Sequence, residues 1–128
     1  MASAMYPKGL INLMKGNCPL DTVAVNAALV DIGTYVYDAT HELYGEITGV
    51  QGTPGALASK TLGVVGSGVF DAADITFTAV TGTSIGAVIL YMDGATKYLL
   101  CYAELASEVL LNGCDIIIQW DDLGIFTI

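Results

Sequence analysis

The run Ile85–Met92 constrains the fold most, because it is apolar at every position apart from Gly86. A strand with one wet face alternates apolar and polar residues, so an unbroken apolar run indicates a strand that is covered on both faces. Asp93-Gly94 follows directly, and this pair favours a tight hairpin because it accepts positive φ. Tyr98–Ala103 is then expected to return as the partner strand.

Short strands separated by turn residues make up most of the remaining chain. Strands are expected at Thr22–Ile32, Leu57–Val65, Ile75–Ala79, Asp115–Trp120 and Ile125–Ile128, and turns at Gln51–Gly55, Gly66–Gly68, Asp71–Asp74, Asn112–Gly113 and Asp121–Gly124. About seven to eight short strands, with turn signals every 8 to 12 residues or so, predict an all-β fold, either a β-sandwich or a jelly-roll-like barrel.

The N-terminal residues carry a helical pattern. Pro7 stands near the first turn, Leu10, Leu13 and Met14 share one face, and Gly16 ends the pattern. Residues 1–16 are therefore expected to form an arm or short helix outside the strands, followed by a single β domain over residues 17–128. A chain of 128 residues agrees with one domain.

Two further segments have mixed signals. Residues 38–49 are expected to hold one helical turn capped by Thr40. Residues 98–111 fit a strand at their start, but Glu104 and Glu108 also lie opposite the apolar positions of a helical pattern. Periodicity alone leaves strand and helix open for residues 98–111.

Charge limits the classes of partner. The chain has 13 Asp and Glu against four Lys and no Arg, a formal net charge of −9. Without Arg, the residue that most often contacts phosphate and guanine, binding to nucleic acid or to an anionic membrane is not expected. No apolar run approaches the 20 or so residues of a membrane span, and Met1–Tyr6 lacks the features of a secretory signal. The chain is expected to fold in the cytosol.

The chain is also more apolar than a lone monomer of this size requires. Hydrophobic residues make up 54% of it and charged residues 13%, with a mean hydropathy of +0.63. This composition predicts self-association into a homo-oligomer or docking on a large partner. The candidate interface residues are Leu10, Ile11, Leu13 and Met14 in the arm, and Leu105, Val109 and Leu110 in the segment of mixed signal.

Patterns that would support catalysis or metal binding are weak. Gly63–Gly68 lacks the Lys of a phosphate-binding loop, and His41, the sole histidine, has no Gly-x-Ser-x-Gly nucleophile motif to act with. No enzymatic activity and no cofactor are expected. The aspartates of the predicted turns are expected to be solvated: Asp71, Asp74, Asp115, Asp121 and Asp122.

Thiol and aromatic side chains are read as structural. Cys18, Cys101 and Cys114 lack the paired spacing of metal ligands, so reduced thiols without a metal are expected. Aromatic residues within the predicted strands would pack in the core or an interface, although a glycan-binding platform on an outer face is an alternative. These residues are Tyr91, Tyr98, Tyr102 and Trp120.

A broader pattern lies in residues 71–83, 87–91 and 112–122, with shorter matches at residues 21–22, 28–31 and 39–41. In this pattern, which covers most of the chain, the sequence resembles small virion structural proteins of tailed bacteriophages. Residues 104–111, which are more apolar than the corresponding loop, and Cys114, where glycine is usual, depart from the pattern.

The resemblance implies a capsid or tail component made in the host cytoplasm. Its most economical reading is a decoration or cement protein on the capsid exterior, with the major capsid protein or another virion protein as partner. A tail or head-fibre component and a free-standing glycan-binding or protein-binding module are the alternatives.

Overall fold

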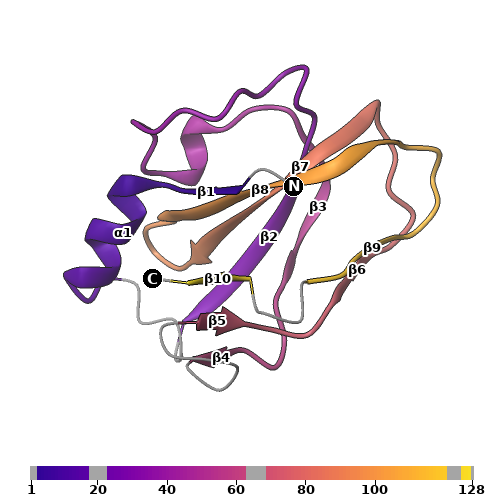
Figure 1. The fold of residues 1–128 in the computed structure, drawn as a ribbon. Helices are drawn as coiled ribbons and strands as arrows, with labels where there is room; N and C mark the ends of the chain where they lie inside the picture. The colour runs from indigo at the N-terminus through magenta and orange to yellow at the C-terminus, as the bar shows by residue number, and fades with distance from the viewer. Residues whose placement is uncertain (1–2, 18–22, 63–68, 121–124, 128) are drawn as a thin grey trace.

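The computed structural model describes residues 3–17, 23–62, 69–120 and 125–127 (Figure 1). These residues form an all-β, sandwich-like fold with one α-helix near the N-terminus, so the predicted fold class is confirmed. Neither helix in the described part of the chain has the length and hydropathy that crossing a membrane requires.

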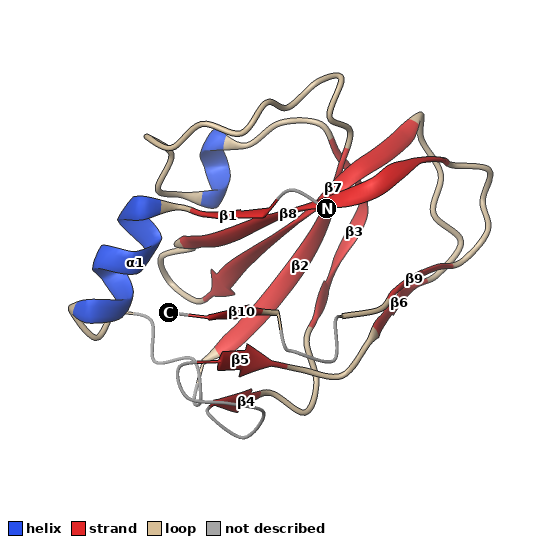
Figure 2. Cartoon of the chain, viewed as in Figure 1, coloured by secondary structure: helices blue, strands red, loops and turns tan. Residues whose placement is uncertain are grey.

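A five-stranded antiparallel sheet forms the middle of the molecule (Figure 2). Its strands, in spatial order, are β1 (Ser3–Met5), β8 (Leu99–Leu110), β7 (Ser84–Asp93), β2 (Ala24–Val30) and β3 (Val50–Ala56). Strand β7 lies in the centre, and its residues from Ile85 to Met92 are all buried. The prediction of a central strand covered on both faces is therefore confirmed.

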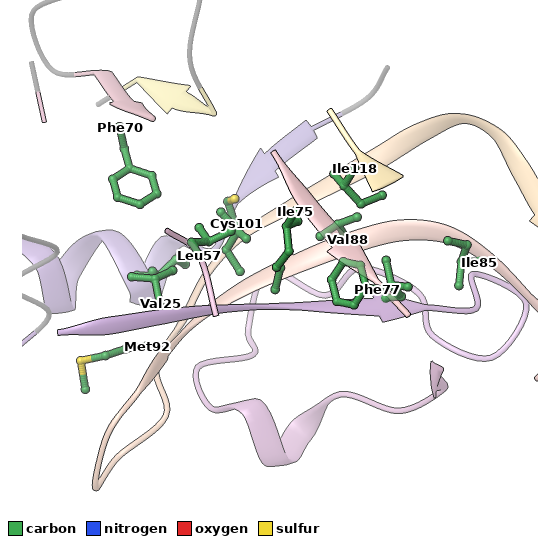
Figure 3. Close-up of a cluster of buried hydrophobic side chains, with 14 of the residues drawn as sticks. Val25, Leu57, Phe70, Ile75, Phe77, Ile85, Val88, Met92, Cys101 and Ile118 are labelled. Atoms are coloured by element: carbon green, nitrogen blue, oxygen red, sulfur yellow. The ribbon is translucent and has the colours of Figure 1, made fainter. Parts of the chain in front are cut away.

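One face of this sheet packs against two small sheets. The first contains β4 (Thr61–Leu62), β5 (Val69–Asp71) and β10 (Phe126–Thr127), and the second pairs β6 (Ile75–Phe77) with β9 (Ile116–Ile118). Side chains from these layers meet in an apolar core that includes Val25, Phe70, Ile75, Val88 and Ile118 (Figure 3).

The segment of residues 31–49 covers the opposite face of the sheet. It contains the 3-10 helix η1 (Tyr44–Glu46), and it packs through Tyr35 and Ile47 onto Val30 and Ile89. Successive residues of a strand point to opposite faces, so β2 and β7 contribute side chains to both cores. Burial on both sides explains why β7 lacks apolar and polar alternation.

The expected N-terminal helix is present as α1 (Pro7–Met14), which begins at Pro7 and is followed by Gly16 at a φ of 79°. The expectation that the arm lies outside the strands is wrong for residues 3–5. These residues form β1, paired with residues 101–103 of β8, and the Tyr6 N–H donates a 3.1 Å hydrogen bond to the Leu100 carbonyl. Three residues are too few for a periodic signal in the sequence. Residues 3–5 form a strand because they pair with the edge of β8 that β7 does not occupy.

The turn expected at Gln51–Gly55 is instead the middle of strand β3. Proline cannot donate a hydrogen bond within a sheet, but β3 is an edge strand, where Pro54 is tolerated. Gly52 has a φ of 70°, and the β2 and β3 register shifts between Ala27 and Leu29. A bulged edge strand thus accommodates residues that locally indicate a turn.

The expected strand at Leu57–Val65 is shorter in the structure, where only Thr61–Leu62 of the described residues form β4. Residues 63–68, including the predicted turn Gly66–Gly68, and the predicted loop at 121–124 lie outside the described residues. The expected cap at Thr40 is also wrong, because the helical turn is at Tyr44–Glu46. Its Glu46 carboxylate accepts hydrogen bonds of 2.9 Å from the backbone N–H groups of Glu42 and Leu43.

The segment of mixed signal is strand β8, with a break in pairing at its centre. Glu104 lies opposite Ala87 and Val109 lies opposite Ile85, so residues 105–108 of β8 face Gly86 alone. The helix that periodicity left open and the loop that the resemblance implied are both wrong for residues 104–110, which belong to strand β8.

The predicted hairpin of β7 and β8 is confirmed. The tight turn with positive φ that Asp93-Gly94 was expected to form is not. Met92 N–H donates to the Tyr98 carbonyl at 2.8 Å, which closes a loop longer than a two-residue turn. Gly94 in this loop does not have a positive φ.

Candidate functional site

The candidate interface residues of α1 differ in exposure. Met14 is 78% exposed and Ile11 is 43% exposed, whereas Leu10 and Leu13 are partly buried and Leu13 packs against the core. Met14 and Ile11 therefore present an apolar surface on α1, which we call the helix patch.

The candidate interface residues of β8 also differ in exposure. Leu105 is partly buried against the core, whereas Val109 and Leu110 are 36% and 78% exposed. We call Val109 and Leu110 the β8 patch. Helix α1 lies over Leu99 at the beginning of β8, because Gly9 approaches the Leu99 carbonyl. Leu99 and Leu110 pair with Tyr91 and Ser84 of β7, which are seven residues apart. At about 3.3 Å per residue, the two patches are therefore on the order of 20 Å apart and do not form one surface.

The four aromatic residues weighed as a glycan platform do not come together. Tyr91 and Tyr102 are buried in the core beneath residues 31–49, whereas Tyr98 and Trp120 pack against the opposite core. Tyr91 stacks on Tyr44 with a centroid distance of 4.1 Å, and Trp120 Nε1 donates to the Ala73 carbonyl at 3.1 Å. Tyr91 and Trp120 are therefore held by contacts within the protein.

A different group of tyrosines lines a pocket of about 420 Å³. Segment 31–49 supplies Tyr35 and Tyr37, and β8 supplies Tyr102 and Glu104. Ala4, Ile32 and Val36 complete the lining. Val36 is 77% exposed at this pocket.

The rings of this group contact one another closely. The centroid of Tyr37 lies 5.1 Å from that of Tyr6 and 5.5 Å from that of Tyr102, and the Tyr35 and Tyr102 centroids are 6.4 Å apart. Tilted pairs at these distances are favourable because the positive edge of one ring meets the negative face of another. The ring contacts hold the pocket wall in place.

The tyrosine hydroxyls form hydrogen bonds within the protein. The Tyr35 hydroxyl lies 2.7 Å from the Tyr6 hydroxyl and 2.9 Å from Nδ1 of His41, and Nε2 of His41 lies 3.8 Å from an Asp38 carboxylate oxygen. Tyr37 donates to the Met5 carbonyl at 2.8 Å. Burial raises the pKa of Tyr6, and the hydrogen bond to Tyr35 raises it further, so this phenol is neutral at pH 7.

One carboxylate, that of Glu104, lines the pocket, and the carboxylate of Asp38 lies near two of its tyrosines. Burial raises the pKa of Tyr102, and the nearby charge of Glu104 adds to the increase. Burial likewise raises the pKa values of Tyr35 and Tyr37, with a further contribution from Asp38. No lysine lines the pocket among the described residues.

Two of the aspartates expected to be solvated form hydrogen bonds within the protein, whereas Asp71 has one carboxylate oxygen that is buried without a hydrogen-bond partner among the described residues. Asp74 accepts a hydrogen bond from the Trp120 N–H, and Asp115 accepts one from the Ala79 N–H. Asp121, Asp122, Cys18 and the glycine-rich stretch lie outside the described residues. Within the described ranges, no three His, Cys, Asp or Glu side chains are grouped to hold a metal ion.

Sequence reasoning missed Tyr6, Tyr35 and Tyr37 as members of a common site. Tyr35 and Tyr37 flank Val36 in a segment without regular structure, and Tyr6 precedes α1, so no periodicity relates them. The alternating Tyr-Val-Tyr triplet was the only local signal. With this geometry established, comparisons with protein-family models, with curated proteins and with solved structures found no match to the chain.

Proposed function

We propose that the protein is a bacteriophage virion structural protein that binds the outside of the capsid as a decoration or cement protein. The observation that carries the proposal is the resemblance in residues 71–83, 87–91 and 112–122. Its partner is the major capsid protein or another virion protein, and its action requires no chemistry. A ligand that binds the intact shell in preference to dissociated subunits stabilises the shell by mass action.

The arrangement of exposed apolar side chains supports this proposal. The helix patch lies on α1 beside the beginning of β8, and the β8 patch lies at its end, on the order of 20 Å away as estimated from the paired residues of β7. The sheet is packed on both faces, so it holds the two patches at a fixed separation. One bound copy could therefore contact two capsid subunits, which is the geometry that a cement protein needs.

The proposal is tested by adding the protein to undecorated shells. Full-length protein is expected to raise the melting temperature of the shell, and Met14→Ser and Leu110→Ser are each expected to reduce occupancy about 5-fold to 10-fold through loss of buried apolar surface. Ile117→Ser is the matched control, because Ile117 is also exposed but lies on β9.

Two results would contradict the proposal. One is a shell melting temperature that does not change at saturating full-length protein, and the other is equal occupancy by all the variants. The first result would favour the tail or head-fibre alternative, and the second would contradict attachment through the helix patch and the β8 patch.

The same exposed surfaces lead us to propose self-association. Light scattering at micromolar concentration should report a mass above that of one chain, and Met14→Ser or Leu110→Ser should lower it. A monomer in this measurement would contradict the homo-oligomer while leaving attachment to a capsid open to the shell assay.

A non-enzymatic binding module is the second candidate, and the tyrosine-lined pocket favours it. The pocket lies within the 300–1,000 Å³ or so of typical ligand sites. The phenol groups of Tyr35 and Tyr37 form hydrogen bonds inside the protein, so they offer few free donors to a sugar. This chemistry favours a protein ligand over a glycan.

A further inference from the structure

We propose that the tyrosine-lined pocket receives a basic side chain, arginine or lysine, from a partner protein. The inference deepens the proposed function, on which it rests for the identity of the partner as a virion protein. The cationic chemistry itself is argued from the pocket and can be tested without capsids.

The aromatic wall supplies the first part of the argument. Tyr35, Tyr37 and Tyr102 line the pocket together, and their hydrogen-bonded hydroxyls restrain Tyr35 and Tyr37. The face of an aromatic ring carries negative electrostatic potential, which attracts ammonium and guanidinium groups within about 6 Å. Ile32 and Val36 can pack against the aliphatic stem of a long basic side chain.

Glu104 supplies the second part. Its side chain is half-buried in the pocket wall, and no ion pair to it is present in the described part of the chain. A carboxylate removed from water is stabilised by a cation that hydrogen-bonds to it. An incoming guanidinium or ammonium group would provide that partner.

The charges around the pocket favour binding of a positively charged group and disfavour binding of a negatively charged one. Asp38 lies near Tyr35 and Tyr37. The positive charge of Lys8 in α1 helps to lower the pKa of Asp38, but Lys8 does not line the pocket. The formal net charge of the whole chain is −9, so long-range attraction also favours a basic partner. A phosphate or an acidic peptide would meet repulsion here.

The experiment is a proton NMR titration of the full chain with capped tripeptides at constant ionic strength. Gly-Arg-Gly and Gly-Lys-Gly are expected to shift the ring resonances of Tyr35, Tyr37 and Tyr102 with millimolar dissociation constants, the range expected for one side chain. Gly-Gln-Gly, which has no positive charge, is expected to leave these resonances unchanged at the same concentrations.

Two variants localise the effect. Glu104→Gln removes the charge with little change of shape and is expected to weaken Gly-Arg-Gly binding at least about 3-fold, the effect of a modest charge-assisted contact. Glu108→Gln makes the same change four residues later on β8, outside the pocket lining, and is expected to bind like the wild type. Circular dichroism of both variants checks that the fold is retained.

The inference is overturned if Gly-Gln-Gly shifts the rings as strongly as Gly-Arg-Gly, if no tripeptide shifts them, or if Glu104→Gln binds like the wild type. The shell assay separates these failures from failure of the proposed function. Tripeptide binding without shell binding would contradict the capsid role alone. Shell binding without a tripeptide response would contradict the cation site alone.

Discussion

The hydroxyl oxygen of Tyr6 lies 2.7 Å from that of Tyr35, which is 29 residues later in the chain. Tyr6 is fully buried, and Tyr35 continues the hydrogen-bonded chain to Nδ1 of His41. When Nδ1 accepts, Tyr35 donates to it, and Tyr6 in turn donates to Tyr35. This contact joins the end of β1 to segment 31–49.

We predict that Tyr35→Phe destabilises the protein more than Tyr6→Phe. Tyr35→Phe leaves the buried Tyr6 hydroxyl without this partner, which costs about 1–3 kcal/mol of the free energy of unfolding. In Tyr6→Phe, the Tyr35 hydroxyl keeps its bond to His41. Urea denaturation measures the difference.

The double variant Tyr6→Phe/Tyr35→Phe controls for the loss of two hydroxyls. Removing both partners leaves no unpaired donor between them, so the double variant should cost less than the sum of the two single changes. If the changes in the free energy of unfolding of the two single variants add up to that of the double variant, the two hydroxyls do not interact.

Gly9→Ala is predicted to displace α1 from β8. A Cβ atom at Gly9 would lie 2.2 Å from the Leu99 carbonyl oxygen, a backbone atom that cannot move aside alone. We expect a loss of about 1–3 kcal/mol, as for overpacked contacts. Gly45→Ala is the matched control, because a Cβ at Gly45 meets nothing within 4 Å. Equal melting temperatures of the two variants would contradict the close contact.

Removal of residues 1–14 should unfold or strongly destabilise the domain. An arm outside the strands, as expected from the sequence pattern, could be removed without unfolding the sandwich. The structure leads to the opposite prediction, since the deletion removes β1 and the buried Tyr6 ring. Circular dichroism melting measures the outcome, and an unchanged melting temperature would contradict the pairing of β1 with β8.

Stability is predicted to fall at acid pH, partly through Asp31. Its carboxylate accepts hydrogen bonds from the Gly33 N–H at 2.9 Å and the Thr83 hydroxyl at 3.0 Å, which tie the end of β2 to the beginning of β7. These bonds, first that of Gly33 and then that of Thr83, hold the pKa of Asp31 below its usual 3.8. The stabilisation is therefore complete above about pH 4 and is lost as the pH falls through the lowered pKa.

Asp31→Asn tests this dependence through unfolding free energies measured between about pH 7 and pH 2. The variant should be less stable than the wild type at pH 7, and the difference should shrink at the acid end. Glu108→Gln, at an exposed position of the β8 bulge, should track the wild type throughout. A constant difference for Asp31→Asn would contradict the role of the carboxylate charge.

Native Cys101 is predicted to resist thiol reagents. Its side chain is buried, and the cost of burying a thiolate raises its pKa to about 12. Cys114 is exposed and should react in the folded protein. In a Cys18→Ser background, a chromogenic disulfide reagent should modify one thiol under native conditions and a second only in denaturant. Rapid native modification of both thiols would contradict the burial of Cys101.

Local sequence determined the elements that have a strong pattern of their own. The central strand follows from the apolar run at Ile85–Met92, and α1 follows from Pro7 and the spacing of Leu10, Leu13 and Met14. Such segments can be predicted from local sequence, because the spacing of apolar residues along consecutive positions matches the side-chain period of a helix or a buried strand. The all-β fold class was therefore predictable.

Only the tertiary structure decided the elements whose local signal was weak or contrary. Pro54 and Gly52 favour a turn but lie in edge strand β3, because pairing with β2 outweighs a preference of about 1 kcal/mol. Likewise, the pocket required β8 to bring Tyr102 and Glu104 beside Tyr35 and Tyr37. Contacts between residues far apart in the chain leave no local pattern, so the sequence alone determined the fold class and the strongly patterned elements, whereas long-range pairing decided the layers, the edges and the site.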